Sequence, residues 1–213
     1  MQITYRELED FLGEIHMVAL DKRTALKGRL KHFQRLGWPA GTNKGKGARV
    51  NYGIGQTMSL AIGMEMLQLG LTPERVVEQL GQAGGALSQG FCKAFADRAE
   101  KDDPIYYMFD PEALNTLRDA ELDKSRTGLQ SMIVSASGLR DALRMASMHW
   151  TRRIALINIT AILTDYISYF SDIGLSSPDA LAEPLERWQQ LETDRFDRFI
   201  GLMNNAATGN VDT

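Results

Sequence analysis

Lys22-Arg-Thr-Ala-Leu-Lys-Gly-Arg-Leu-Lys-His-Phe-Gln-Arg-Leu36 opens the stretch of sequence around which this chain is organised. From Lys22 to Met64 there are nine lysines or arginines and neither aspartate nor glutamate. The whole chain has 24 basic and 27 acidic residues, so the remainder has 15 basic and 27 acidic ones. A segment of charge +9 thus accompanies a remainder of charge −12 within a net charge of −3. Such segregation attracts polyanions to one part of a surface.

The first part of this segment predicts a helix over residues 22–36, with Asp21 as its N-cap. Its apolar residues recur on one face at spacings of four and three: Leu26, Leu30 and Phe33. Its basic residues recur every four positions on another face: Arg23, Lys27 and Lys31. The sequence Gly37-Trp-Pro ends the helix, because glycine favours a C-terminal turn and proline cannot continue a helix. An amphipathic helix with a basic face is therefore expected.

Residues 41–52 are rich in glycine and lysine and end in the extended pattern Arg49-Val-Asn-Tyr52. A tight basic loop followed by strand-forming residues predicts a β-wing. A second helix is expected over residues 54–69. The sequence Thr72-Pro-Glu then provides the cap and first turn of a third helix over residues 75–80. A basic helix, a basic wing and a helix pair suit the binding of duplex DNA.

Three pieces of this segment resemble regulators of the MerR type. Arg29-Leu-Lys-His-Phe-Gln-Arg-Leu-Gly-Trp38 looks like that family's Thr-Leu-Arg-Tyr-Tyr-Glu-Arg-Leu-Gly-Leu. Arg49-Val-Asn-Tyr52 is similar to the Arg-x-x-Tyr that ends the family's wing. Met66-Leu-Gln-Leu-Gly-Leu-Thr-Pro-Glu-Arg-Val-Val-Glu-Gln-Leu80 resembles its Leu-Gly-Phe-Ser-Leu-Glu-Glu-Ile helix pair. The resemblance covers residues 20–82, about 30 per cent of the chain.

The resemblance implies a winged helix-turn-helix, with the 22–36 helix in the major groove and the wing on phosphates. Lys31 stands at the family's phosphate-contacting arginine, and His32 stands at the tyrosine that follows it. The sequence departs from the family in two places. The helix before residue 20 is longer, and Gly81-Gln-Ala-Gly-Gly85 replaces the start of the long dimer-forming helix. The family's mode of dimerisation is therefore not carried over.

The expected DNA contacts come from two elements. The basic helix would present polar side chains to the major groove: Arg23, Thr24, Lys27, Lys31 and His32. The wing would hold phosphates through basic and aromatic side chains: Lys44, Lys46, Arg49 and Tyr52.

The predicted fold class is mainly α with minor β (α+β). We expect a MerR-like winged helix-turn-helix domain over residues 1–82, a mixed but mostly helical C-terminal domain over 86–203, and a flexible tail over 204–213. Gly81, Gly84 and Gly85 are interpreted as the joint between the two domains.

Further elements are predicted along both parts of the chain. Thr4 and Glu7 form a capping box that begins a helix over 5–20. Other helices are expected over 86–100, after Asp110, over 139–148 and over 178–203. Strands are expected over 105–109 and 131–136. Residues 152–170 fit either a strand followed by a helix or one helix, and we prefer the strand followed by a helix.

Composition and motifs disfavour several classes of protein. A single cysteine, Cys92, permits no intramolecular disulfide and fits a reducing compartment. We interpret it as a buried structural thiol in preference to a redox sensor. Charged residues interrupt the N-terminal segment, which disfavours a secretory signal peptide. The longest uncharged apolar run, 154–164, is shorter than the roughly 20 residues of a membrane helix. The glycines of 41–47 lack the spacing of a phosphate-binding loop. The histidines lie far apart and outside any metal-ligand pattern. We expect a cytoplasmic, nucleoid-associated protein without enzymatic activity, cofactor or metal.

The function expected from the sequence is that of a sequence-specific transcription regulator that binds double-stranded DNA as a homodimer. The C-terminal domain would dimerise, contact a protein partner or sense an effector. Two alternatives remain. One is an architectural factor that bends DNA, as the excisionases of phages do. The other is a non-enzymatic adaptor whose basic face meets an acidic protein partner.

Overall fold

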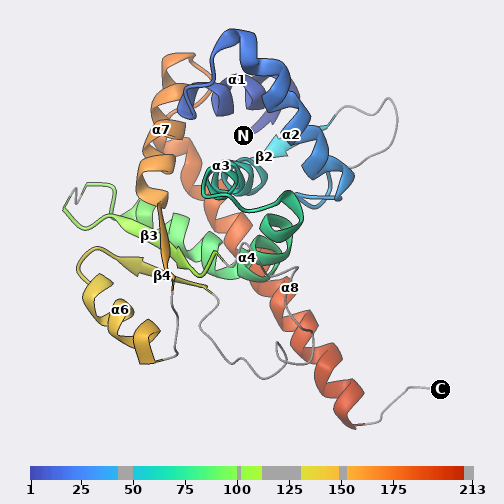
Figure 1. Ribbon diagram of the computed structural model, residues 1–213, viewed down its shortest axis with the longest axis vertical. Helices are drawn as coiled ribbons and strands as arrows, with labels where there is room; N and C mark the ends of the chain where they lie inside the picture. Colours follow the sequence, from blue (N-terminus) through green and yellow to red (C-terminus); the bar gives the residue numbers. More distant parts are fainter. Residues whose placement is uncertain (43–49, 100–101, 112–130, 149–152, 209–213) are drawn as a thin grey trace.

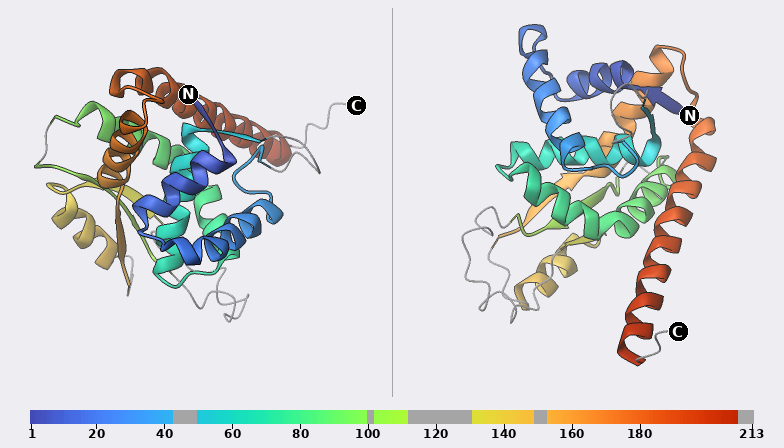
Figure 2. Two further views of the ribbon diagram at one scale, coloured as in Figure 1. Left: turned by 90° about the horizontal axis from the view of Figure 1, so that it is seen from above. Right: turned by 90° about the vertical axis from the view of Figure 1, so that its right-hand side faces the viewer.

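The structure is a computed structural model that describes residues 1–42, 50–99, 102–111, 131–148 and 153–208, with the main chain alone for 199–208. Helix dominates it (67%) beside a small proportion of strand, which confirms the expected class of mainly α with minor β. Figures 1 and 2 show the helices grouped around a central one, α3, with the larger sheet and α6 toward one side.

The chain begins with strand β1 (Gln2–Thr4) and helix α1 (Tyr5–Ile15). The predicted capping box is present: the Thr4 Oγ1 accepts a hydrogen bond from the Glu7 N–H at 3.3 Å, and the Glu7 Oε2 accepts one from the Thr4 N–H at 2.6 Å. α1 ends at Ile15 and not at residue 20. Met17 follows with a positive φ of 49°, which is incompatible with a continuing right-handed helix.

Helix α2 (Arg23–Arg35) follows a single 3-10 turn over Leu20–Lys22. The prediction that Asp21 caps α2 is wrong. Lys22 occupies the N-cap with helical dihedral angles, whereas a side-chain cap needs an extended residue there. The predicted apolar face is confirmed by the burial of all three residues: Leu26, Leu30 and Phe33.

The end of α2 lies where the sequence predicts it. Gly37 has a φ of 73°. Its N–H donates to the Gln34 carbonyl, and the Trp38 N–H donates to the Phe33 carbonyl, both at 3.0 Å. This Schellman arrangement needs a left-handed residue after the helix, which glycine adopts without a Cβ clash.

Strand β2 (Asn51–Gly53) pairs antiparallel with β1, with Tyr52 opposite Ile3. The last strand of the predicted wing is therefore paired with the N-terminal segment, and both of these side chains are buried in the core. The predicted wing tip, with Lys44, Lys46 and Arg49, lies outside the described residues.

Helix α3 (Ile54–Gln68) confirms the second predicted helix and lies at the centre of the fold (Figure 1). Its buried residues occur on all sides of the helix, which is the pattern of a helix surrounded by protein. It contacts α4, α7 and α8.

Helix α4 (Pro73–Ala96) begins at the predicted cap, Thr72, and runs without interruption through the predicted joint. The prediction of separate helices on either side of Gly81–Gly85 is wrong. Each glycine costs a helix about 1 kcal/mol relative to alanine. Burial outweighs this cost, because Leu80 and Leu87, on either side of the glycines, belong to one hydrophobic core. The predicted domain boundary thus falls within a continuous helix.

The larger sheet is antiparallel, with β3 (Ile105–Phe109) between β4 (Ser131–Ser135) and β5 (Ala155–Asn158). All three strands lie where they were predicted. Helix α7 (Ile159–Asp172) directly follows β5, which confirms the preference for a strand and then a helix. The helix predicted after Asp110 falls within residues 112–130, which are outside the described part of the chain.

The two faces of this sheet have different partners. Ile105, Tyr107 and Phe109 belong to the main core, which also contains residues of α4 and α7. On the other face, Met108 belongs to a small cluster with residues of helix α6 (Leu139–Met148). This helix has the bounds that the sequence predicts.

Helix α8 (Ala182–Thr208) follows a 3-10 turn over Pro178–Leu181. Its first turns pack on α3 and α4, and Leu185 and Trp188 are buried there. Beyond them the helix projects away from the body of the molecule (Figures 1 and 2). The helix extends to Thr208, so the first part of the predicted tail is helical. None of the described helices combines the length and apolar character needed to cross a bilayer.

Candidate nucleic-acid interface

Helix α2 carries most of the predicted DNA-binding residues, and its apolar face fixes which of them point outward. Leu26, Leu30 and Phe33 anchor it in the main core. It packs against α1 and α4. The basic residues of α2 therefore lie either beside one of these two helices or on the side opposite the core.

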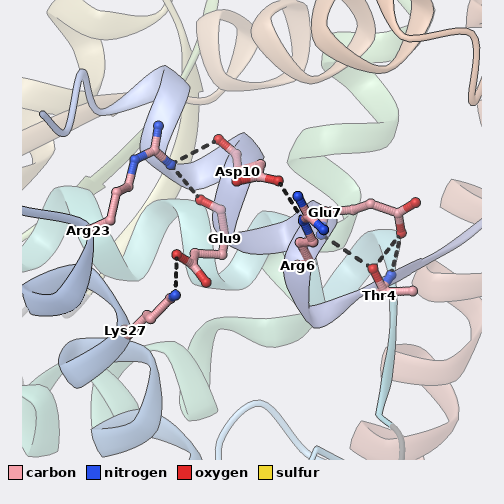
Figure 3. Close-up of polar contacts among 7 residues, drawn as sticks. All are labelled: Thr4, Arg6, Glu7, Glu9, Asp10, Arg23 and Lys27. Atoms are coloured by element: carbon pink, nitrogen blue, oxygen red, sulfur yellow. Dashed lines mark hydrogen bonds and ion pairs between the residues drawn. The ribbon is translucent and has the colours of Figure 1, made fainter. Parts of the chain in front are cut away.

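Arg23 lies against α1 (Figure 3). Its Nη1–H donates to the backbone carbonyls of Glu9 at 3.0 Å and of Asp10 at 3.4 Å. The guanidinium covers Gly13 so closely that a Cβ built there would lie 1.4 Å from Nη1. Arg23 thus holds α2 to α1, and the prediction that it faces the major groove is wrong.

Lys27 also faces α1 (Figure 3). Its Nζ lies 3.3 Å from the Glu9 Oε1, and the Glu9 side chain is only 10% exposed. A nearly buried carboxylate needs such a partner, because an unpaired charge there is costly. The ion pair links Lys27 to α1, and because its side chain is still 48% exposed, its contact with DNA stays a prediction. The pKa of the neighbouring Tyr5 hydroxyl is raised to about 12, mainly by burial and to a smaller extent by the charge of Glu9.

Two further residues of the predicted DNA-binding site, His32 and Tyr52, contact other side chains of the protein. The His32 Nε2 lies 3.0 Å from the Glu74 Oε1 of α4. A hydrogen bond from its own backbone N–H, with help from Thr72 and His32, holds the pKa of Glu74 below its ordinary value. Tyr52 is buried, and its hydroxyl accepts a hydrogen bond from the Gln34 Nε2 at 2.6 Å. The prediction that Tyr52 contacts phosphate is therefore wrong.

The side of α2 opposite the core is an open strip. Its members follow one another at spacings of four, three and four, and all are exposed: Thr24, Gly28, Lys31 and Arg35. We call this set the outward strip. Within the described part of the chain, neither Lys31 nor Arg35 forms an ion pair. A Cβ built on Gly28 meets no atom within 4 Å, so the middle of the strip is open.

The outward strip shares Thr24 and Lys31 with the predicted site and adds Arg35, which the prediction missed. The helical spacing from Thr24 through Lys31 to Arg35, opposite the apolar face, could have identified it. Lys44, Lys46 and Arg49 are not placed by the structure. Among the described residues no group of three or more histidine, cysteine or acidic side chains is arranged to hold a metal.

No protein-family model matches the chain, and neither a curated protein nor a solved structure is recognisably similar to it.

The new role of Arg23 leads to a testable expectation. Arg23→Ala removes two hydrogen bonds from a charged group at the α1–α2 contact, so it should lower the free energy of unfolding by about 1.5–3 kcal/mol. Urea unfolding followed by circular dichroism measures this change. Thr24→Ala, at an exposed neighbouring position, is the control and should change stability by less than about 0.5 kcal/mol. An Arg23→Ala variant as stable as the wild type would contradict the anchoring role.

Proposed function

We propose that this chain binds duplex DNA through the outward strip of α2 and acts as a sequence-specific transcription regulator. The observation that carries the proposal is the outward strip. Its two cations, Lys31 and Arg35, form no ion pairs among the described residues, and the apolar face of their helix is buried in the core. They lie within a 43-residue segment that has no acidic residue. Unpaired cations on a helix face are the ordinary means of binding the phosphate backbone.

The dimensions of the strip suit this role. An α-helix with its side chains is about 10–12 Å across, and the major groove of DNA is about 12 Å wide. Gly28 has no side chain, so the helix can approach the DNA backbone closely between Thr24 and Lys31. Lys31 and Arg35 can then reach phosphates or guanine edges from the same face of the helix.

We propose that the chain binds DNA in the arrangement that the MerR resemblance implies. α2 would enter the groove, and α3 and α4 would be the helix pair behind it. Lys44, Lys46 and Arg49 would add phosphate contacts. Because the strip holds only two cations, these further contacts would contribute a large part of the affinity.

Selection of duplexes from a randomised pool by the full-length protein tests the proposal. A sequence-specific regulator enriches a motif. Tight binding without an enriched motif would favour the architectural alternative, which a DNA-bending assay would then examine. Failure to bind any duplex at low salt would contradict both DNA-binding functions.

One observation favours the adaptor as a second candidate. Helix α6 exposes three large apolar side chains: Leu143, Met145 and Met148. Exposed methionines are common at protein-binding surfaces. If the protein is an adaptor, its affinity for a protein partner should depend on these side chains of α6, and heparin should compete as well as DNA for the basic segment.

We further propose that the projecting part of α8 pairs with a second copy of the chain. Phe196 is 61% exposed on this part of the helix. Phe199 and Met203 continue the apolar pattern in the sequence. A dimer would present two copies of α2, and paired half-sites give one small module sufficient affinity and specificity.

Phe196→Glu should convert a dimer into a monomer, because it places a charge in the proposed apolar contact. Light scattering after size-exclusion chromatography measures the mass, and DNA affinity should fall together with dimerisation. Gln190→Glu adds the same charge at another exposed position of α8 and should leave the dimer intact. A monomeric wild-type protein, or a dimeric Phe196→Glu variant, would rule out α8 as the dimer contact.

A further inference from the structure

A groove of about 580 Å³ lies between α8, the first turn of α3 and the middle of α4. Its volume is within the range of roughly 300–1,000 Å³ that is usual for small-molecule sites. Trp38 provides an aromatic wall, Trp188 contributes little because it is only 9% exposed, and Leu191 adds an exposed apolar side chain. No residue of the outward strip lines it, so the groove is separate from the proposed DNA-binding face.

Three arginines of α8 line the groove, and they differ in how they are paired: Arg187, Arg195 and Arg198. Arg187 forms an ion pair with Glu183, and the Nη1 of Arg195 lies 3.4 Å from a carboxylate oxygen of Glu192. Arg198 donates its Nε–H to the backbone carbonyl of Asp194 at 3.1 Å. Within the described residues it has no carboxylate partner. The groove thus holds one arginine more than its own carboxylates neutralise, which favours an anionic ligand.

Gly81 is the second independent feature. Glycine within a helix costs about 1 kcal/mol relative to alanine. Packing requires glycine at position 84, because a Cβ there would lie 2.6 Å from the Glu192 Oε2. Gly81 lines the groove, and a Cβ there would meet no atom within 4 Å. Packing therefore does not require glycine at this position, whereas a larger side chain would occupy the groove.

We propose that this groove binds a small organic anion with a flat apolar body. The body occupies the space beside Gly81 and Trp38. Arg198, assisted by Arg195, binds the carboxylate or phosphate group. The site is independent of the proposed DNA-binding function and does not require it.

Calorimetric titration of the full-length protein with three anionic probes tests the site: benzoate, indole-3-acetate and phenyl phosphate. At least one probe should bind saturably at one site per chain. Indole-3-acetamide, the neutral counterpart of indole-3-acetate, should bind about tenfold more weakly than the acid. Arg198→Gln should weaken binding of the anion by a similar factor and leave binding of the amide unchanged.

Gly81→Leu should abolish binding because its side chain fills the groove. Gly85→Leu is the matched control: Gly85 also has no atom within 4 Å of a built Cβ, and it does not line the groove. Melting curves confirm that both variants fold. The proposal is overturned if none of the three anions binds saturably, or if the two leucine variants bind equally. It is also overturned if Lys31→Ala and Arg35→Ala, and not Gly81→Leu, remove binding, because the anion then belongs to α2.

Discussion

Replacing Phe11 by alanine should lower the free energy of unfolding by about 3–5 kcal/mol, the largest stability change that we expect from one substitution in this chain. Phe11 is fully buried. Its ring centroid lies 5.4 Å from that of Tyr166, 5.5 Å from that of Tyr169 and 5.3 Å from that of Phe170. Loss of the ring leaves a cavity among three aromatic side chains of α7, and these contacts add to the burial itself.

The same substitution tests whether the chain unfolds as one unit. Phe11 belongs to the first 82 residues, whereas its three partners belong to the second half of the chain. We expect one cooperative urea transition that shifts as a whole, whether it is followed by circular dichroism or by tryptophan fluorescence. Leu20→Ala, at a position 86% exposed, should shift it by less than about 0.5 kcal/mol. Two transitions, of which Phe11→Ala moves only one, would show that the two halves fold independently.

Local signals in the sequence predicted most of the elements correctly. The capping box at Thr4, the left-handed Gly37 and the cap at Thr72 each depend on a few neighbouring residues, so they can be recognised without the rest of the fold. Gly81–Gly85 misled the prediction for the opposite reason. Glycine disfavours a helix by a small amount, and packing from residues far away in the sequence exceeds that amount. The neighbours that supply the packing cannot be read from the local pattern.

The candidate site was less predictable because charge in a sequence does not indicate its partner in space. Spacing placed Arg23, Lys27 and Lys31 on one side of α2. The fold then brings Glu9 and the backbone of α1 against the first two. His32 likewise meets Glu74, 42 residues later. The acid-free segment of the sequence is therefore partly neutralised in the folded protein. Among the described residues of α2, open charge remains on the strip opposite the core and on Arg29, which is exposed and forms no ion pair.

The double variant Lys31→Ala/Arg35→Ala should weaken binding to every duplex. Each lost phosphate contact lowers the slope of log affinity against log salt by about 0.9, so two lower it by about 1.8. Extrapolated from 1 M salt, where such contacts contribute little, this slope corresponds to roughly a 60-fold loss of affinity at 0.1 M. Both side chains are exposed, so the melting temperature should barely change.

Fluorescence anisotropy titrations of the double variant, at two salt concentrations and with selected and scrambled duplexes, measure this loss. Arg140→Ala/Arg144→Ala is the matched control, because it removes the same net charge from exposed positions of α6. If both double variants lose affinity equally, only net charge matters and α2 is not the DNA-binding element. A loss confined to Lys31→Ala/Arg35→Ala, equal for both duplexes, assigns phosphate contacts to the strip. Unchanged affinity in that variant, with folding intact, would remove the outward strip from the DNA-binding surface and leave the adaptor as the better account of the chain.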